Sequence, residues 1–147
     1  MKDDANEAPN SGRIALLRAI LKVQEEMPQL KKNSTAVVPS KTGRGFEYKY
    51  ITLDEIWAAL RPVLTKHGLV VTNKMDGTML ETSLIHVESG EAISCAFPIN
   101  VNQPPQQLGS AFSYARRYAL CALLQIVADK DDDASAAQSA PKAADPF

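Results

Sequence analysis

The fold is decided by one stretch, residues 109–124, which reads Gly109-Ser110-Ala111-Phe112-Ser113-Tyr114-Ala115-Arg116-Arg117-Tyr118-Ala119-Leu120-Cys121-Ala122-Leu123-Leu124. It predicts a helix about 25 Å long at 1.5 Å per residue. We expect Gly109 and Ser110 to cap the start of this helix, because they follow the Pro104-Pro105 pair. Small and aromatic residues recur at spacings of three and four and predict one apolar stripe for packing. The stripe consists of Ala111, Tyr114, Ala115, Tyr118 and Ala122.

A pair of arginines lies beside this stripe. Arg117 falls on a neighbouring face together with Ser113, and Arg116 projects about 100° away from Arg117. A guanidinium group keeps its charge at neutral pH and matches the geometry of phosphate oxygens. We therefore interpret Ser113, Arg116 and Arg117 as candidate phosphate contacts. The alternative, in which both arginines are solvated or paired with carboxylates, stays equally open at this point.

Two patterns occur together along the chain. The first is the string from Tyr114 to Leu120, which is followed closely by the aspartates of residues 129–133. The second runs from Tyr48–Asp54 through Leu60–Leu64 to Lys66–Leu69. In order and spacing these blocks resemble the Erf family of phage single-strand annealing proteins. The resemblance covers about residues 11–133.

The resemblance implies a single-stranded DNA-binding protein that pairs complementary strands without ATP, in DNA recombination and DNA repair. Such a protein acts as a homo-oligomer, either a ring or a helical filament, in the bacterial host cytoplasm if a phage encodes it. The resemblance also implies an α+β fold, an antiparallel β-meander packed by a long helix, which single-strand annealing proteins share. Basic residues of that helix contact the DNA backbone, and Arg116 and Arg117 match this place.

Composition and charge divide the chain into three parts. Its 147 residues, of which 45% are hydrophobic, suffice for one buried core. Residues 11–128 carry thirteen Lys and Arg against nine Asp and Glu, whereas both ends are acidic. We expect a disordered N-terminal segment (1–10), a basic annealing core (11–128) and an acidic, disordered C-terminal tail (129–147). No hydrophobic signal sequence follows Met1, so a cytoplasmic protein is expected.

Residues 41–50 form the most basic segment, and aromatic residues alternate along it. Phe46, Tyr48 and Tyr50 share one face of a predicted strand, so they are candidates for base stacking. An aromatic stripe on a strand more often belongs to the core, so the basic residues are the stronger indication of single-stranded nucleic acid. The candidate DNA-binding residues are Lys41, Arg44, Lys49, Ser113, Arg116 and Arg117.

The remaining core predicts two more helices and three strands. A helix is expected from Ser11 to about Met27, with an apolar face broad enough to cover a sheet or a neighbouring subunit. A capping box at residues 52–55 starts another helix, in which Trp57 is expected in the core and Pro62 is expected to cause a kink or break. Asp76-Gly77 and Ser89-Gly90 predict two-residue turns, which give an antiparallel meander. The predicted strands are residues 69–75, 78–88 and 91–101, with a short strand at 35–38.

Catalytic and cofactor motifs do not occur in the sequence. Gly43 and Gly45 lack the following Lys and Ser or Thr of a phosphate-binding loop, so no ATP site is predicted. Cys95 and Cys121 lie in apolar surroundings and are expected to be reduced thiols, not metal ligands. We therefore expect no cofactor and no enzyme activity. The alternative function is a metal-dependent nuclease that uses the carboxylates of Asp129–Asp133.

The chain finishes in Asp145-Pro146-Phe147. This ending is similar to the acidic Pro-Phe terminus of bacterial single-strand-binding proteins, which recruits partner proteins. Lys142 interrupts the acidity that such a terminus carries, and so short a motif also arises by chance. The three residues are a candidate docking tail for host replication or repair proteins.

Overall fold

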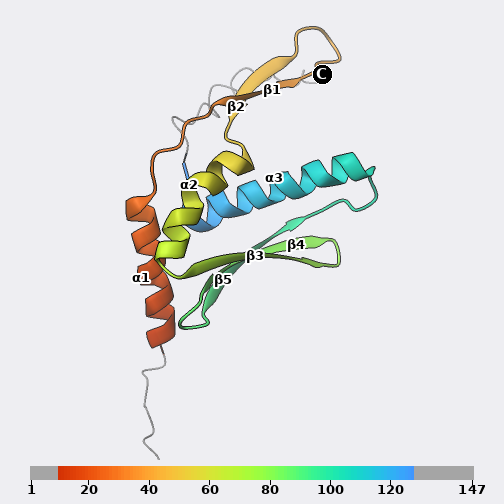
Figure 1. Cartoon of the computed structure of the whole chain (residues 1–147). Helices are drawn as coiled ribbons and strands as arrows, with labels where there is room; N and C mark the ends of the chain where they lie inside the picture. Colours follow the sequence, from red (N-terminus) through yellow and green to blue (C-terminus); the bar gives the residue numbers. More distant parts are fainter. Residues whose placement is uncertain (1–9, 128–147) are drawn as a thin grey trace, which may run out of the picture.

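The computed structural model describes residues 10–127, in which three helices and five strands form. Figure 1 shows helix α3 crossing the molecule between a small β-hairpin on one side and a three-stranded sheet on the other. In chain order the elements are α1 (Ser11–Glu26), β1 (Ser34–Val38), β2 (Phe46–Tyr50), α2 (Leu53–Lys66), β3 (Leu69–Asp76), β4 (Met79–His86), β5 (Ala92–Pro98) and α3 (Pro105–Leu124). The predicted α+β class is therefore confirmed. Among the described residues, no helix is long and apolar enough to cross a membrane.

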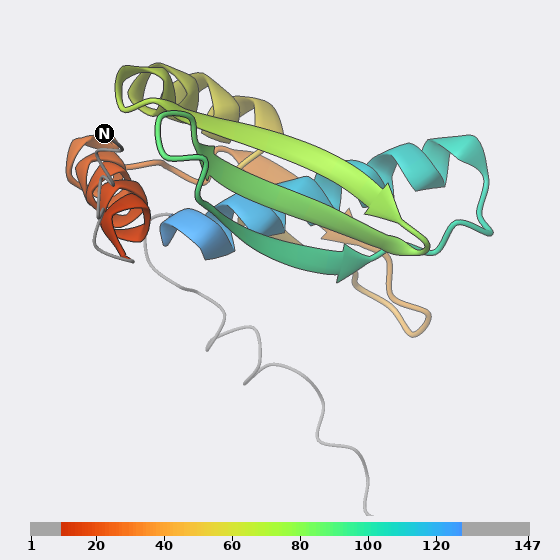
Figure 2. The same cartoon turned by 90° about the horizontal axis from the view of Figure 1, so that it is seen from below.

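Strands β3, β4 and β5 form the predicted antiparallel meander. The tight turn between β3 and β4 consists of Gly77 and Thr78, one residue later than the predicted Asp76-Gly77 pair. Gly77 has a φ of 58°, which glycine adopts without strain. The connection between β4 and β5 is longer than the expected two residues, since β4 ends at His86 and β5 begins at Ala92. Figure 2 shows α3 behind the meander, while the opposite face of the sheet is open.

The core fills the space between the helices and the covered face of the meander. Its fully buried side chains come from α1, α2 and β4, and burial of each contributes about 1.5–3 kcal/mol relative to exposure. They include Leu16, Val23, Ile56, Leu60, Leu64 and Leu84. A second, smaller cluster of Leu80, Ile99 and Ala115 lies under the first half of α3. The long helix is thus fixed to the meander along most of its length.

Helix α3 begins four residues before the expected start. Its N-cap is Pro104 and its first residue is Pro105, so Gly109 and Ser110 lie inside the helix and do not cap it. Proline suits the first helical position, because its φ is already helical and its missing N–H would have had no partner. The helix then ends at Leu124, where Gln125 adopts the left-handed conformation with a φ of 55°.

The predicted apolar stripe of α3 was wrong in part. Ala115 is buried, but Tyr114 and Tyr118 are 52% and 44% exposed. The face that packs on the core is instead made by Ala115, Ala119, Leu120 and Leu124. The tyrosine set and the alanine–leucine set follow the same helical spacing. The alanine–leucine set packs on the core, because its small alanines permit close approach of the helix. The tyrosines are therefore left on the side of α3 that faces the hairpin.

The capping box at the start of α2 is confirmed. The Thr52 hydroxyl accepts a hydrogen bond of 3.2 Å from the Glu55 amide, and a Glu55 carboxylate oxygen accepts one of 2.8 Å from the Thr52 amide. The expected break at Pro62 does not occur, and α2 runs unbroken from Leu53 to Lys66. Pro62 lies on the exposed side of the helix, where water can satisfy the carbonyl that loses its partner. Trp57 is also not in the core, since it is 37% exposed.

Strands β1 and β2 pair only with each other and form a separate two-stranded sheet. The sequence predicted the short strand at 35–38 and the strand through Phe46–Tyr50 and did not assign their partners. In the hairpin Val38 lies opposite Phe46, and Ser34 lies opposite Tyr50. The hairpin extends away from the body of the molecule on the far side of α3 (Figure 1). Its aromatic residues therefore lie outside the main core.

Candidate nucleic-acid interface

The hairpin carries a row of aromatic rings on one face. Alternation along β2 places Phe46, Tyr48 and Tyr50 on the same side, as predicted. Neighbouring ring centroids are 6.2 Å and 5.9 Å apart, so the three rings form one continuous surface. Phe46 is 56% exposed and Tyr48 is 41% exposed. These rings are available to stack against a base, which buried core aromatics would not be.

Arg117 connects this row to α3. Its guanidinium carbon lies 4.8 Å from the centroid of the Tyr50 ring and 5.5 Å from those of Tyr114 and Tyr118. One of its nitrogens also donates a hydrogen bond of 3.4 Å to the carbonyl oxygen of Ile51. Arg117 is half-buried, and the rings around it lower the cost of removing its charge from water. This side chain holds the base of the hairpin against the helix.

On the other side of Arg117 the aromatic surface continues across α3 to the meander. The ring centroids of Tyr114 and Tyr118 are 4.3 Å apart, and Phe97 of β5 lies 6.3 Å from Tyr118. A hydrogen bond with Tyr118, together with partial burial, raises the pKa of Tyr114 above that of a free tyrosine. We call the whole surface the aromatic strip. It consists of Phe46, Tyr48, Tyr50, Tyr114, Tyr118 and Phe97.

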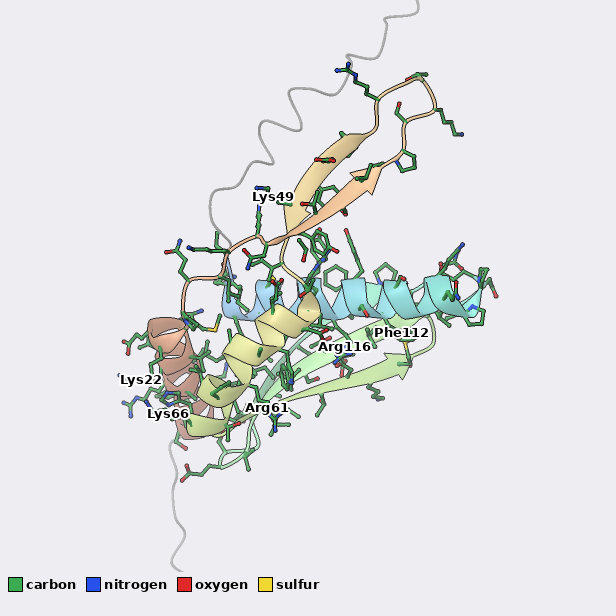
Figure 3. The ribbon with its side chains drawn as sticks, turned by 45° about the horizontal axis from the view of Figure 1, so that its top comes forward. Lys22, Lys49, Arg61, Lys66, Phe112 and Arg116 are labelled. Carbon is green, nitrogen blue, oxygen red and sulfur yellow. The ribbon has the colours of Figure 1, made fainter. Side chains whose placement is uncertain are left out.

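Arg116 lies on a different side of α3 from Arg117. It is exposed and forms no hydrogen bond or ion pair with another described residue. Figure 3 shows Arg116 and Phe112 on the side of α3 away from the hairpin. Consecutive helical residues diverge by about 100°, so the two arginines cannot point at the same group. The structure therefore separates the predicted pair into one free cation and one half-buried cation.

The basic candidates of the hairpin lie in its loop and on the face opposite the rings. Lys41 and Arg44 lie in the loop that joins the strands, and Lys49 lies near the base of the hairpin (Figure 3). All three are exposed and lack a hydrogen bond or ion pair with any other described residue. Alternation along β2 places Lys49 on the face opposite the rings. Ser113 is exposed on α3, one turn before Arg117.

Tyr114, Tyr118 and Phe97 were not among the residues predicted to bind DNA. The sequence assigned the two tyrosines to the core, because their spacing of four residues is the same as that of a buried stripe. Arg117, which lies between the two tyrosines in the sequence, was the signal that this face is not buried. Arginine is mostly found at the surface, so an arginine between the two tyrosines argues against a fully buried face.

Metal ions in proteins are held by groups of His, Cys, Asp and Glu side chains. In residues 10–127, no group of three or more His, Cys, Asp and Glu side chains is arranged to hold a metal ion. Cys95 and Cys121 are not paired in a disulfide, and burial raises the pKa of each thiol. Asp129–Asp133, proposed for a nuclease, and the candidate docking tail Asp145-Pro146-Phe147 lie outside the described residues.

The chain matches the model of a known protein family. The family model described as the ERF superfamily matches residues 16–147, which is most of the chain. The search of the curated proteins and the search of the solved structures found no match. The matched region contains the hairpin, the meander and all of α3.

Proposed function

Because the chain belongs to the ERF superfamily, we propose that it binds single-stranded DNA and anneals complementary strands without ATP during homologous recombination. Membership of the family supports an annealing function in recombination. The more specific proposal rests on the aromatic strip, whose outer rings Phe46 and Tyr48 are exposed, and on the free cations Lys41 and Arg44 in the adjoining loop. Aromatic faces stack on bases of any sequence, and Lys and Arg contact the phosphates that every nucleotide shares.

In this proposal the cations and the rings have separate roles. Lys41 and Arg44 are exposed and hold the phosphates beside the rings. Lys49 and Arg116 are exposed on other faces of the hairpin and of α3, and they hold phosphates where the strand leaves the rings. Phe46 and Tyr48 stack on bases and keep them apart from one another. Ser113 and the remaining N–H donors of Arg117 contact phosphate where the hairpin meets α3. The strand is thereby extended, and its pairing edges are free to test a complement.

A single copy of this small chain covers few nucleotides. Many weak contacts summed along a homo-oligomer, whether ring or filament, hold a long strand while allowing mismatched segments to dissociate. Base pairing supplies the free energy of annealing, so neither a nucleotide nor any other cofactor is required. The protein acts as a binding protein in the cytoplasm, not as an enzyme. Its acidic C-terminal residues 129–147 bind host replication or repair proteins.

An annealing assay tests this proposal. The full chain is incubated with complementary labelled oligonucleotides in the absence of nucleotide and divalent metal, and duplex formation is followed. The proposal predicts faster annealing than that of the free oligonucleotides. No acceleration at protein concentrations that coat the strands would contradict it. Parallel samples with Mg²⁺ and a labelled single strand detect the shortening that the alternative nuclease would produce.

The salt dependence of binding identifies the phosphate contacts. Each phosphate contact on a single strand contributes about 0.7 to the slope of log K against log salt concentration. Arg116→Ala should reduce the slope by about that amount without lowering the thermal midpoint of unfolding. Lys74→Ala is the matched control, because Lys74 is an exposed cation on β3, away from the aromatic strip. Equal slopes for wild type and Arg116→Ala would remove Arg116 from the interface.

A further inference from the structure

Helix α1 has apolar residues on two opposite sides. Leu16 and Val23 are fully buried in the core. Ile14, Leu17 and Leu21, spaced by three and four residues, form a second stripe and are 47%, 51% and 52% exposed. A surface helix ordinarily presents polar residues on that side. Figure 1 shows α1 at one side of the molecule, with the other described elements on its inner side.

Helix α2 presents a groove on its outer side. Its lining includes the small side chain of Ala58, the ring of Pro62 and the partly exposed side chain of Trp57. Trp57 exposes 37% of its surface and lies beside apolar groups that nothing covers in the described chain. The groove is lined by Asp54, Trp57, Ala58, Arg61, Pro62 and Thr65.

The charges beside the stripe and the groove are complementary. On α1, Arg18 precedes Glu25 by two helical turns, and on α2 Asp54 precedes Arg61 by the same interval. The two intervals are each about 10.5 Å at 1.5 Å per residue, and the order of charge is reversed between them. Arg18, Asp54 and Arg61 have no ion pair among the described residues. Glu25 pairs with Lys22 only, at an exposed position.

We infer that the apolar stripe of α1 packs in the α2 groove of a second copy of this chain, with the two helices parallel. In that register Arg18 faces Asp54 of the next copy and Glu25 faces Arg61, which places Leu21 between Trp57 and Ala58. Parallel packing matches both charge pairs, whereas antiparallel packing opposes like charges. The stripe and the groove are different surfaces, so the contact is head to tail and generates a ring or a filament. This inference rests on the proposed function, because it supplies the interface of the annealing oligomer.

Charge reversal tests the register. Arg18→Glu and Asp54→Arg each place like charges across the contact and should weaken association by about tenfold or more in sedimentation velocity. The chain that carries both substitutions restores an opposite pair at every contact and should assemble like wild type. Circular dichroism checks that α2 folds in the Asp54→Arg variant, since this substitution also removes an acidic residue from its first turn. A double variant that associates no better than the single variants would overturn the proposed register.

Cysteine cross-linking tests the contact without changing charge. In a background with Cys95 and Cys121 replaced by alanine, one chain carries Leu21→Cys and a second carries Ala58→Cys. Mild oxidation of the mixture should give a disulfide-linked pair, while neither variant alone should. Thr72→Cys replaces Ala58→Cys in the control mixture, because Thr72 is exposed on β3. A linked pair from Leu21→Cys alone would indicate packing of α1 on α1 and overturn the inference.

The outcomes separate this interface from the proposed function. Assembly by sedimentation without the Leu21–Ala58 cross-link would overturn the α1–α2 contact, and annealing would still be tested independently. A cross-linked assembly that does not accelerate annealing would refute the proposed function and leave the contact in place. A chain that is monomeric both with and without DNA would overturn the contact directly.

Discussion

Replacement of Arg117 by alanine should detach the hairpin from α3 and leave the rest of the fold intact. The guanidinium carbon lies within 5.5 Å of three ring centroids. One guanidinium nitrogen donates a hydrogen bond to the carbonyl oxygen of Ile51, which lies between β2 and α2. Alanine removes all of these contacts at once. The two strands of the hairpin pair only with each other, and an isolated two-stranded sheet has marginal stability in water.

The magnitude follows from these contacts. A cation over an aromatic ring contributes about 0.5–1 kcal/mol where the site is partly solvated. Three rings and one long hydrogen bond therefore give about 2 kcal/mol for Arg117, which corresponds to about a thirtyfold change in an equilibrium constant. The effect is confined to the hairpin, because the core side chains of α1, α2 and β4 do not contact it.

Hydrogen exchange measures this effect element by element. Amides paired between β1 and β2 should exchange about thirtyfold faster in Arg117→Ala, whereas those between β3 and β4 should keep their rates. Arg117→Lys keeps the charge but loses the planar stacking, so it should resemble alanine more than wild type. Arg116→Ala is the matched control on the same helix and should change neither set of amides. Unchanged exchange across β1 and β2 in Arg117→Ala would refute the anchoring role.

Three further results are expected. Phe46→Ala and Tyr48→Ala should each weaken single-strand binding by about 1–3 kcal/mol in titrations, with the salt slope unchanged, because stacking releases no counterions; a changed slope would mean that the rings do not stack on bases. The backbone hydrogen bond from Thr52 lowers the pKa of Glu55 below 4.5, so its share of stability is present above that pH and is lost as the pH falls through the lowered value. Thermal midpoints should therefore fall less between pH 5 and about pH 3 in Glu55→Gln than in wild type, and parallel curves would contradict the role of the capping box. Deletion of residues 145–147 should leave annealing in vitro intact and reduce recombination in cells, whereas equal recombination would end the docking hypothesis.

The local signals in the sequence predicted the elements that depend on them. The Thr52–Glu55 box and the end of α1 before Pro28 occur as expected, because each is fixed by interactions within a few residues. The turn at Gly77 lies within one residue of its predicted place. The separation of the hairpin from the meander was not predicted. Helix α2 lies between β2 and β3 in the chain, and the sequence does not show whether strands on either side of a helix join one sheet. The start of α3 was misplaced because glycine and serine resemble a cap, whereas the proline before them begins the helix.

The candidate site was predicted in its composition and not in its arrangement. The alternating rings of β2 and the basic residues near them were visible in the sequence. Ala115 and Ala119 of α3 pack in the core, so Tyr114 and Tyr118 lie on another face of the helix, beside Arg117. Helical spacing alone does not distinguish these two faces, because both are apolar and both repeat every three to four residues. Tertiary packing thus converted an expected core stripe into part of the surface that faces the hairpin.

Photochemical cross-linking tests the central claim most directly, namely that single-stranded DNA lies along the aromatic strip. Oligonucleotides containing 5-bromouracil are irradiated with the full chain, and the linked peptides are identified by mass spectrometry. Cross-links should fall on β2 and on the tyrosines of α3, at Phe46, Tyr48, Tyr114 or Tyr118. Cross-links confined to the open face of the meander, where Ser94 and Ala96 are exposed, would contradict the claim.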